Sequence, residues 1–293
     1  MAIGVAIGVA APAAAAQQQR PTGTARVIVH GVPDVESVRV RTMDTFRHGD
    51  GMQGQSLPTP RMLDPQRLEV GCPAGSACEV NLRTKGGDRL SFEVFAMDPE
   101  VVVDLDVDGR RVQVDYRDDD GRSATMAAIA EDAHTLAEAC AATPRRAVTA
   151  AFAQRDLLRK ARDRRDPLMA DVATMALAEG RCIAMPEDAE ITEAVLDVDP
   201  DAAAIAWWPG GLVDAATRVE PARGWAKIDA AVASAPRPEQ AGTLLFVAYM
   251  RATERGNVDA RDLALARLRV PSLSRTRGRQ AAEKQERFRE QTR

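Results

Sequence analysis

Cysteine is the residue type in this chain with the clearest chemical potential, and the sequence holds four of them. Cys72 and Cys78 have five residues between them and lie between two expected strands, which favours a structural disulfide across a short Pro/Gly loop. The alternative is a redox couple, although catalytic pairs usually have the spacing C-x-x-C at the start of a helix. Cys140 and Cys182 fall in separate expected helices, where they either pair with each other or remain buried as small apolar residues.

Aspartates form a second pattern with chemical meaning. Asp104, Asp106, Asp108, Gly109 and Asp115 match D-x-D-x-D-G-x5-D, the spacing of an EF-hand-like calcium loop. The approach to this run is β-branched, and two arginines follow the glycine. Carboxylates on a strand also diverge along it, so a β-hairpin is favoured and calcium is the alternative.

Tryptophans are the remaining candidates for an interaction. Trp207 and Trp208, in WWPGG, suit either a ligand platform or an anchor between helix layers, and Trp225 follows in the next helix. The three histidines are scattered without metal-ligand spacing. The sequence shows neither a nucleophilic serine motif nor a glycine-rich phosphate loop. We therefore assign no catalytic residue, no metal and no cofactor, and we lean against an enzyme.

The expected fold is α+β. Apolar and polar residues alternate in VESVRVRT, CEVNLR and LSFEV, which predicts an antiparallel β-sandwich of about seven strands over residues 25–120, with a long loop over 44–60. The clearest hairpin is predicted to turn at Asp108-Gly109. That turn places Leu105 opposite Val112 and Val103 opposite Val114.

Residues 121–270 show helical spacing and predict stacked helical hairpins that resemble tetratricopeptide (TPR) repeats. In the clearest hairpin, Gly256 and Asn257 supply a left-handed turn before a helix over 258–268. The apolar face of the preceding helix consists of Leu245, Ala248, Tyr249 and Ala252. Residues 271–293 predict a basic C-terminal helix.

An apolar, small-residue leader over residues 1–16 predicts a signal peptide, with a disordered alanine-rich leader as the alternative. Residues 17–24 then form a disordered linker, and the mature chain is expected to be periplasmic or secreted from a bacterium. No apolar run is long enough to span a bilayer. The composition, with 45% hydrophobic and 28% charged residues, is that of a globular protein. A net charge of −4 argues against a nucleic-acid partner.

Three segments carry a family resemblance. They are AVLDVDPDAAAIAWWPGGLVDAA, the helix with Trp225 and Ile228, and YMRATERGNVDARDLALARL. Together with the leader and the strand region, they resemble the N-terminal half of TlpA-like thiol:disulfide oxidoreductases of the bacterial envelope. In that family the activity resides in a C-terminal thioredoxin domain with a W-C-x-x-C motif, which this sequence lacks. The resemblance therefore implies no catalytic residue here.

Three hypotheses follow. The first is a non-catalytic extracytoplasmic interaction protein whose partner is an envelope protein, with a thioredoxin-like protein as one option. The second is a redox protein that uses its own cysteine pair or a thioredoxin domain encoded separately. The third is an envelope protein that binds a ligand or calcium.

Overall fold

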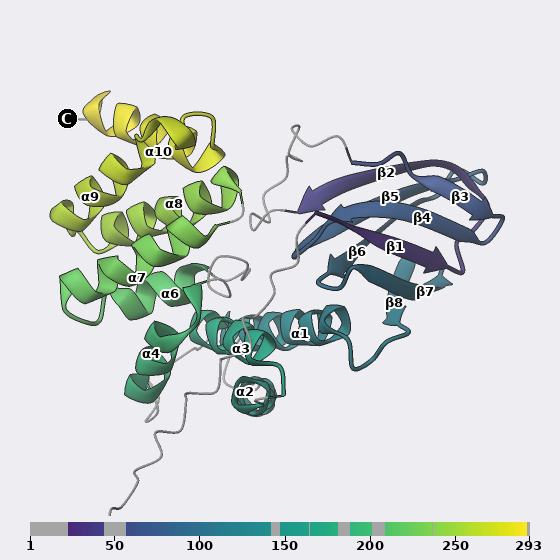
Figure 1. The fold of residues 1–293 in the computed structure, drawn as a ribbon, viewed down its shortest axis with the longest axis horizontal. Coiled ribbons are helices and arrows are strands. Elements are labelled where there is room, and N and C mark those ends of the chain that lie inside the picture. Colours follow the sequence, from purple (N-terminus) through teal and green to yellow (C-terminus); the bar gives the residue numbers. More distant parts are fainter. Residues whose placement is uncertain are drawn as a thin grey trace, which may run out of the picture.

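The computed structural model describes residues 23–43, 57–141, 147–163, 165–180, 188–200, 209–235 and 237–291. Within these ranges the chain forms eight strands followed by nine α-helices, an α+β fold (Figure 1). The last strand ends at Tyr116 and the first helix begins at Arg122. The predicted leader and linker, residues 1–22, lie outside the described residues, as does most of the expected loop over 44–60.

The strands form two sheets. The five-stranded sheet has the order β3-β4-β1-β7-β8, and the three-stranded sheet has the order β2-β5-β6. Pairing is antiparallel except between β1 and β7, which run parallel. The strands are β1 (Thr24–His30), β2 (Val35–Met43), β3 (Arg61–Asp64), β4 (Arg67–Pro73), β5 (Ser76–Thr84), β6 (Arg89–Ala96), β7 (Glu100–Asp108) and β8 (Arg111–Tyr116).

One apolar cluster joins the two sheets. Valines from both sheets are fully buried in it, including Val29 and Val103 from the first and Val80 and Val94 from the second. They come from the alternating runs in the sequence, because side chains two residues apart share one face of a strand. A polar bond adds to this contact: the hydroxyl of Tyr116 on β8 accepts a hydrogen bond of 2.9 Å from the backbone nitrogen of Phe95 on β6.

The predicted β7–β8 hairpin is confirmed, but its predicted register is wrong by two residues. Val103 lies opposite Tyr116 and Leu105 opposite Val114, so the turn residues are Gly109 and Arg110. Gly109 has a φ of +61°, which the first central position of a type II′ turn requires. A shift of two residues keeps each side chain on its face, so the predicted division into inner and outer residues survives.

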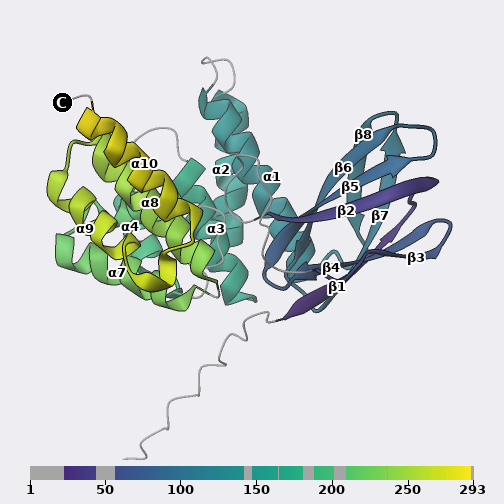
Figure 2. The same cartoon turned by 90° about the horizontal axis from the view of Figure 1, so that it is seen from above.

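The helices follow as one series. They are α1 (Arg122–Ala141), α2 (Ala147–Arg162), α3 (Pro167–Gly180), α4 (Asp188–Asp197), α6 (Pro209–Ala216), α7 (Pro221–Ser234), α8 (Pro238–Glu254), α9 (Val258–Leu268) and α10 (Arg277–Gln291), with a short 3-10 turn, η2 (Pro271–Leu273), before α10. Both views place α1 beside the strands and α9 and α10 at the far end of the molecule (Figure 1, Figure 2). None of these helices is both long and apolar enough to cross a membrane.

The predicted hairpin of α8 and α9 is confirmed in its helices and corrected at its turn. The predicted apolar face of α8 is buried, and Tyr249 at its centre has no exposed surface. Gly256 alone adopts the left-handed conformation, with φ at +66°. Asn257 instead caps α9, since its side chain accepts a hydrogen bond of 3.0 Å from the nitrogen of Ala260.

The predicted C-terminal helix is α10, which packs against α8. Two glycines allow the close approach: a Cβ atom on Gly278 would lie 2.1 Å from the carbonyl oxygen of Gly242. The hydroxyl of Tyr249 also donates a hydrogen bond of 2.7 Å to Glu286 of α10. The basic helix is therefore part of the helical core rather than a free tail.

Candidate functional site

Cys72 and Cys78 form a disulfide, and it connects the two sheets. Cys72 lies in β4 and Cys78 in β5, so both belong to strands and only a two-residue turn separates those strands. β4 belongs to the five-stranded sheet and β5 to the three-stranded sheet. Both cysteines have no exposed surface and lie within the apolar cluster. The expected Pro/Gly loop is thus shorter than predicted, and the bond crosses the interior.

The aspartates of the predicted calcium pattern are spread along the β7–β8 hairpin. The guanidinium of Arg117 binds Asp104 through two hydrogen bonds of 2.7 and 2.8 Å, and this contact lowers the pKa of the Asp104 carboxyl. Asp115 accepts a hydrogen bond of 2.9 Å from Gln113, and Asp108 lies opposite Arg111. Within the described ranges, no three His, Cys, Asp or Glu side chains converge as metal ligands.

Trp225 is the one predicted interaction residue whose surroundings the structure describes. It lies on α7, half-buried against the helical core, and the guanidinium carbon of Arg267 lies 4.6 Å from its ring centroid. Arg267 of α9 also donates a hydrogen bond of 2.6 Å to Asp229 of α7. Trp225 therefore helps join two helices. Trp207, Trp208, Cys182 and the side chain of Cys140 lie outside the described residues.

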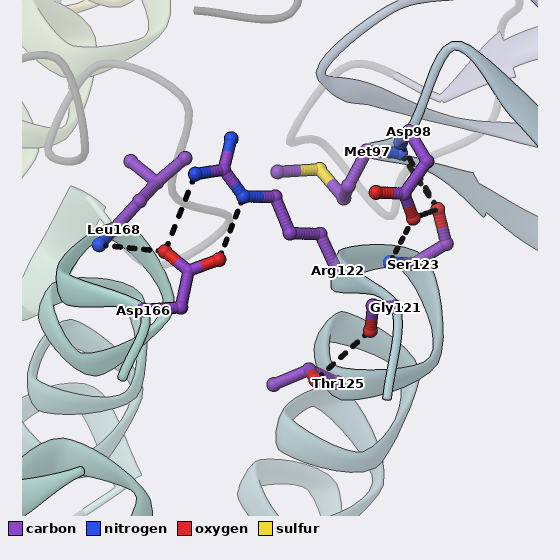
Figure 3. Close-up of polar contacts among 8 residues, drawn as sticks. All are labelled: Met97, Asp98, Gly121, Arg122, Ser123, Thr125, Asp166 and Leu168. Carbon is purple, nitrogen blue, oxygen red and sulfur yellow. Dashed lines mark hydrogen bonds and ion pairs between the residues drawn. The ribbon is translucent and has the colours of Figure 1, made fainter. Parts of the chain in front are cut away.

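A polar network fastens the strands to the helices (Figure 3). Ser123, near the start of α1, donates from its backbone nitrogen and its hydroxyl to Asp98, at 2.8 and 2.7 Å. The Ser123 hydroxyl oxygen in turn accepts from the nitrogens of Met97 and Asp98, at 3.0 and 3.2 Å. The neighbouring Arg122 binds Asp166 at 2.7 Å, and Asp166 accepts from the nitrogen of Leu168 in α3.

This network fixes the two parts of the chain relative to each other. Asp98 lies in the segment between β6 and β7, and it caps the helix that begins at Arg122. Apolar contacts add to this network, because the side chains of Phe95 and Met97 belong to the helical apolar cluster. We call the network and these contacts the polar joint. The described strands and helices therefore share a packed and hydrogen-bonded boundary.

The outer face of the three-stranded sheet carries arginine, serine and asparagine. Ser37, Arg83 and Arg89 form one row across β2, β5 and β6. In the next row, Arg39 lies opposite Asn81, which lies opposite Ser91. Together with Arg41, these residues line a surface hollow of about 300 Å³, which we call the arginine face.

The charges on the arginine face are only partly balanced. Arg83 forms an ion pair of 2.9 Å with Glu36 at the edge of the sheet. Among the described residues, no carboxylate lies within ion-pair distance of Arg39, Arg41 or Arg89. In the strand register of the described residues, Glu79 lies opposite Arg41 without forming an ion pair with it, whereas Arg39 lies opposite Asn81 and Arg89 lies opposite Arg83.

Sequence reasoning missed both the arginine face and the polar joint. The sequence did carry a signal for the arginine face, since VESVRVRT, VNLR and RLS place Arg, Ser or Asn at the alternate positions that face outward. Recognising the face required knowing that these three strands are neighbours. The joint had no local signal, because Asp98 and Ser123 are 25 residues apart and neither belongs to a known motif.

No family model, curated protein or solved structure matches this chain.

Proposed function

We propose that this chain is a non-catalytic, extracytoplasmic interaction protein, related to the N-terminal half of TlpA-like thiol:disulfide oxidoreductases. The buried disulfide between Cys72 and Cys78 carries the proposal. Structural disulfides persist in oxidising compartments outside the cytoplasm. Thiol–disulfide exchange requires a thiolate to reach a sulfur atom, and both of these cysteines have no exposed surface. A bond in this position suits stabilisation rather than electron transfer.

The arrangement of the elements supports an interaction role. We assign the two sheets to a β-sandwich, because both contribute to one interior cluster. We assign the helices to TPR-like stacked hairpins, because α8 and α9 are joined by a short turn and each helix pair packs on its neighbours. Stacked helical hairpins expose extended surfaces that commonly bind other proteins.

The proposed partner is an envelope protein, and a thioredoxin-like protein encoded separately is the partner that the resemblance favours. The boundary at Asp98 and Ser123 supports this role, since a fixed joint holds the sheets and helices as one surface. Signal-peptide removal within residues 1–16 and a periplasmic or secreted location remain predictions.

The experiment compares the full chain with a variant that lacks residues 2–16, both expressed in a bacterial host. Cells are quenched in acid, and free thiols are labelled with a maleimide after unfolding. We expect Cys72 and Cys78 to be protected in the full chain and labelled in the leaderless form. Labelling of both cysteines in the full chain would contradict the proposal. N-terminal sequencing of the protected protein reports the cleavage site.

Binding is tested separately with a purified thioredoxin-like envelope protein from the same organism. We expect a saturable heat of binding in calorimetry. We also expect that this chain, when added alone, does not reduce insulin. The absence of binding would remove this partner class.

A further inference from the structure

We propose that the arginine face binds an extended acidic segment of a partner protein, whose carboxylates pair with Arg39, Arg41 and Arg89. This inference rests on the proposed role in protein interaction and adds the chemistry of the partner. The face lies on β2, β5 and β6 and surrounds a hollow of about 300 Å³.

The positions of Arg83 and Arg89 favour the binding of an anionic ligand to this face. Arg83 and Arg89 lie directly opposite each other on β5 and β6. Like charges in this cross-strand position destabilise a sheet. Glu36 neutralises Arg83, but no described carboxylate pairs with Arg89. An incoming carboxylate would relieve this repulsion, which gives the bound state an advantage that the free sheet lacks.

The spacing of the face fits an extended peptide. Arg39 and Arg41 occupy alternate positions of β2 and share its outer face. Alternate side chains of any extended chain repeat at about 6.6 to 6.8 Å, so acidic residues at alternate positions of a partner match this interval. Guanidinium groups bind carboxylates through two parallel hydrogen bonds, which adds specificity to the charge attraction.

Two other polar side chains of the face can donate to the same ligand, the hydroxyl of Ser37 and the amide of Asn81, which lies between Arg39 and Ser91. The Ser91 hydroxyl already donates a hydrogen bond of 2.9 Å to Glu79. The side-chain nitrogen of Asn81 is buried and has no hydrogen-bond partner among the described residues. A buried donor without an acceptor costs free energy, and a carboxylate oxygen that enters between the arginine side chains would satisfy it.

The composition of the face favours a peptide over nucleic acid or a glycan. No aromatic residue lines the hollow in the described part of the chain. Single-stranded nucleic acids and sugar rings commonly bind by stacking on aromatic side chains, which this face does not supply.

The test uses fluorescence anisotropy with a labelled peptide of alternating aspartate and serine. The variant Arg39→Gln/Arg89→Gln removes two unpaired charges from the face. The matched control Arg110→Gln/Arg287→Gln removes two exposed charges from the β7–β8 turn and from α10. We expect the first variant to weaken binding at least about tenfold, and the control to change it by less than about twofold. Equal losses in both variants would overturn the proposal.

A second variant separates binding from folding. Asn81→Asp places a carboxylate among the arginines while keeping the side-chain shape. This carboxylate then competes with those of the peptide for the guanidinium groups. We expect it to lose peptide binding while its melting temperature is unchanged or raised. Binding at the native level would overturn the proposal.

The competing ligand classes are part of the same measurement. A single-stranded oligonucleotide or a sulfated oligosaccharide that binds more tightly than the peptide, with the same dependence on Arg39 and Arg89, would overturn the assignment to an acidic peptide. Thiol protection of Cys72 and Cys78 is measured independently, so failure here leaves the proposed function standing.

Discussion

The carboxylate of Asp98 accepts hydrogen bonds from both the backbone nitrogen and the hydroxyl of Ser123, at 2.8 and 2.7 Å. The two residues belong to different parts of the fold, the strand region and the first helix (Figure 3). Asp98 thereby satisfies a backbone nitrogen at the start of α1, which would otherwise lack an intrahelical partner. Because Ser123 is only 2% exposed, the bonds form away from water.

Ser123→Ala is expected to lower the free energy of unfolding by about 1 to 3 kcal/mol, because it leaves the nitrogens of Met97 and Asp98 without their acceptor. Urea denaturation measures the effect. Thr125→Ala is the control, since that hydroxyl bonds only to the carbonyl of Gly121 within the same turn. Thr125→Ala should change the free energy of unfolding by less than about 0.5 kcal/mol. Equal costs for both substitutions would contradict the role of the joint.

Gly278→Ala is expected to destabilise the packing of α10 on α8 by about 1 to 3 kcal/mol, because the added methyl group would collide with the carbonyl oxygen of Gly242 at 2.1 Å. This cost exceeds the gain in helix propensity of about 1 kcal/mol from replacing glycine. Arg287→Ala, at an exposed position of the same helix, serves as the control. A more stable Gly278→Ala protein in thermal unfolding would refute the close helix contact.

The two tyrosines of the protein are expected to titrate abnormally. Burial raises the pKa of Tyr116 well above its ordinary value. Burial, together with the bond to Glu286, raises the pKa of Tyr249 to about 12. The absorbance at 295 nm of the folded protein should therefore stay flat from pH 9 to pH 11, whereas the unfolded chain titrates near pH 10. A native titration near pH 10 would contradict this burial.

The same shifts set a pH dependence of stability. Both folded pKa values lie above the unfolded value of about 10, so the contribution of these tyrosines is fully present below pH 10 and is lost as pH rises toward about 12. The free energy of unfolding should fall over that window. Tyr116→Phe should reduce the slope, because this phenol then no longer releases a proton on unfolding. An unchanged slope would exclude Tyr116 as its source.

Local patterns predicted much of the fold. Alternating valines identified the strands with buried faces, and the spacing of Leu245, Ala248 and Tyr249 identified the buried face of α8. These predictions succeeded because hydrophobic periodicity reports directly on which side of an element is buried. The glycine at 256 also marked the end of α8 correctly.

Features that depend on distant pairing were not predictable. The β7–β8 register depends on whether Gly109 occupies the first or second turn position, and both choices give sensible cross-strand pairs. The cysteine spacing indicated a bond but not that it joins two sheets, since strand order is a property of the whole fold. The arginine face was not predictable for the same reason, since its residues come from three strands.

The central claim is that the chain stabilises and binds rather than exchanges disulfides, and insulin reduction by dithiothreitol tests it most directly. We predict that the wild-type protein does not accelerate the onset of turbidity, because the sulfurs of Cys72 and Cys78 are enclosed by the two sheets. The Cys72→Ala/Cys78→Ala variant should give the same turbidity curve and lose about 2 kcal/mol of stability instead. Acceleration by the wild type that the variant lacks would show that this pair is a redox site and would contradict the account.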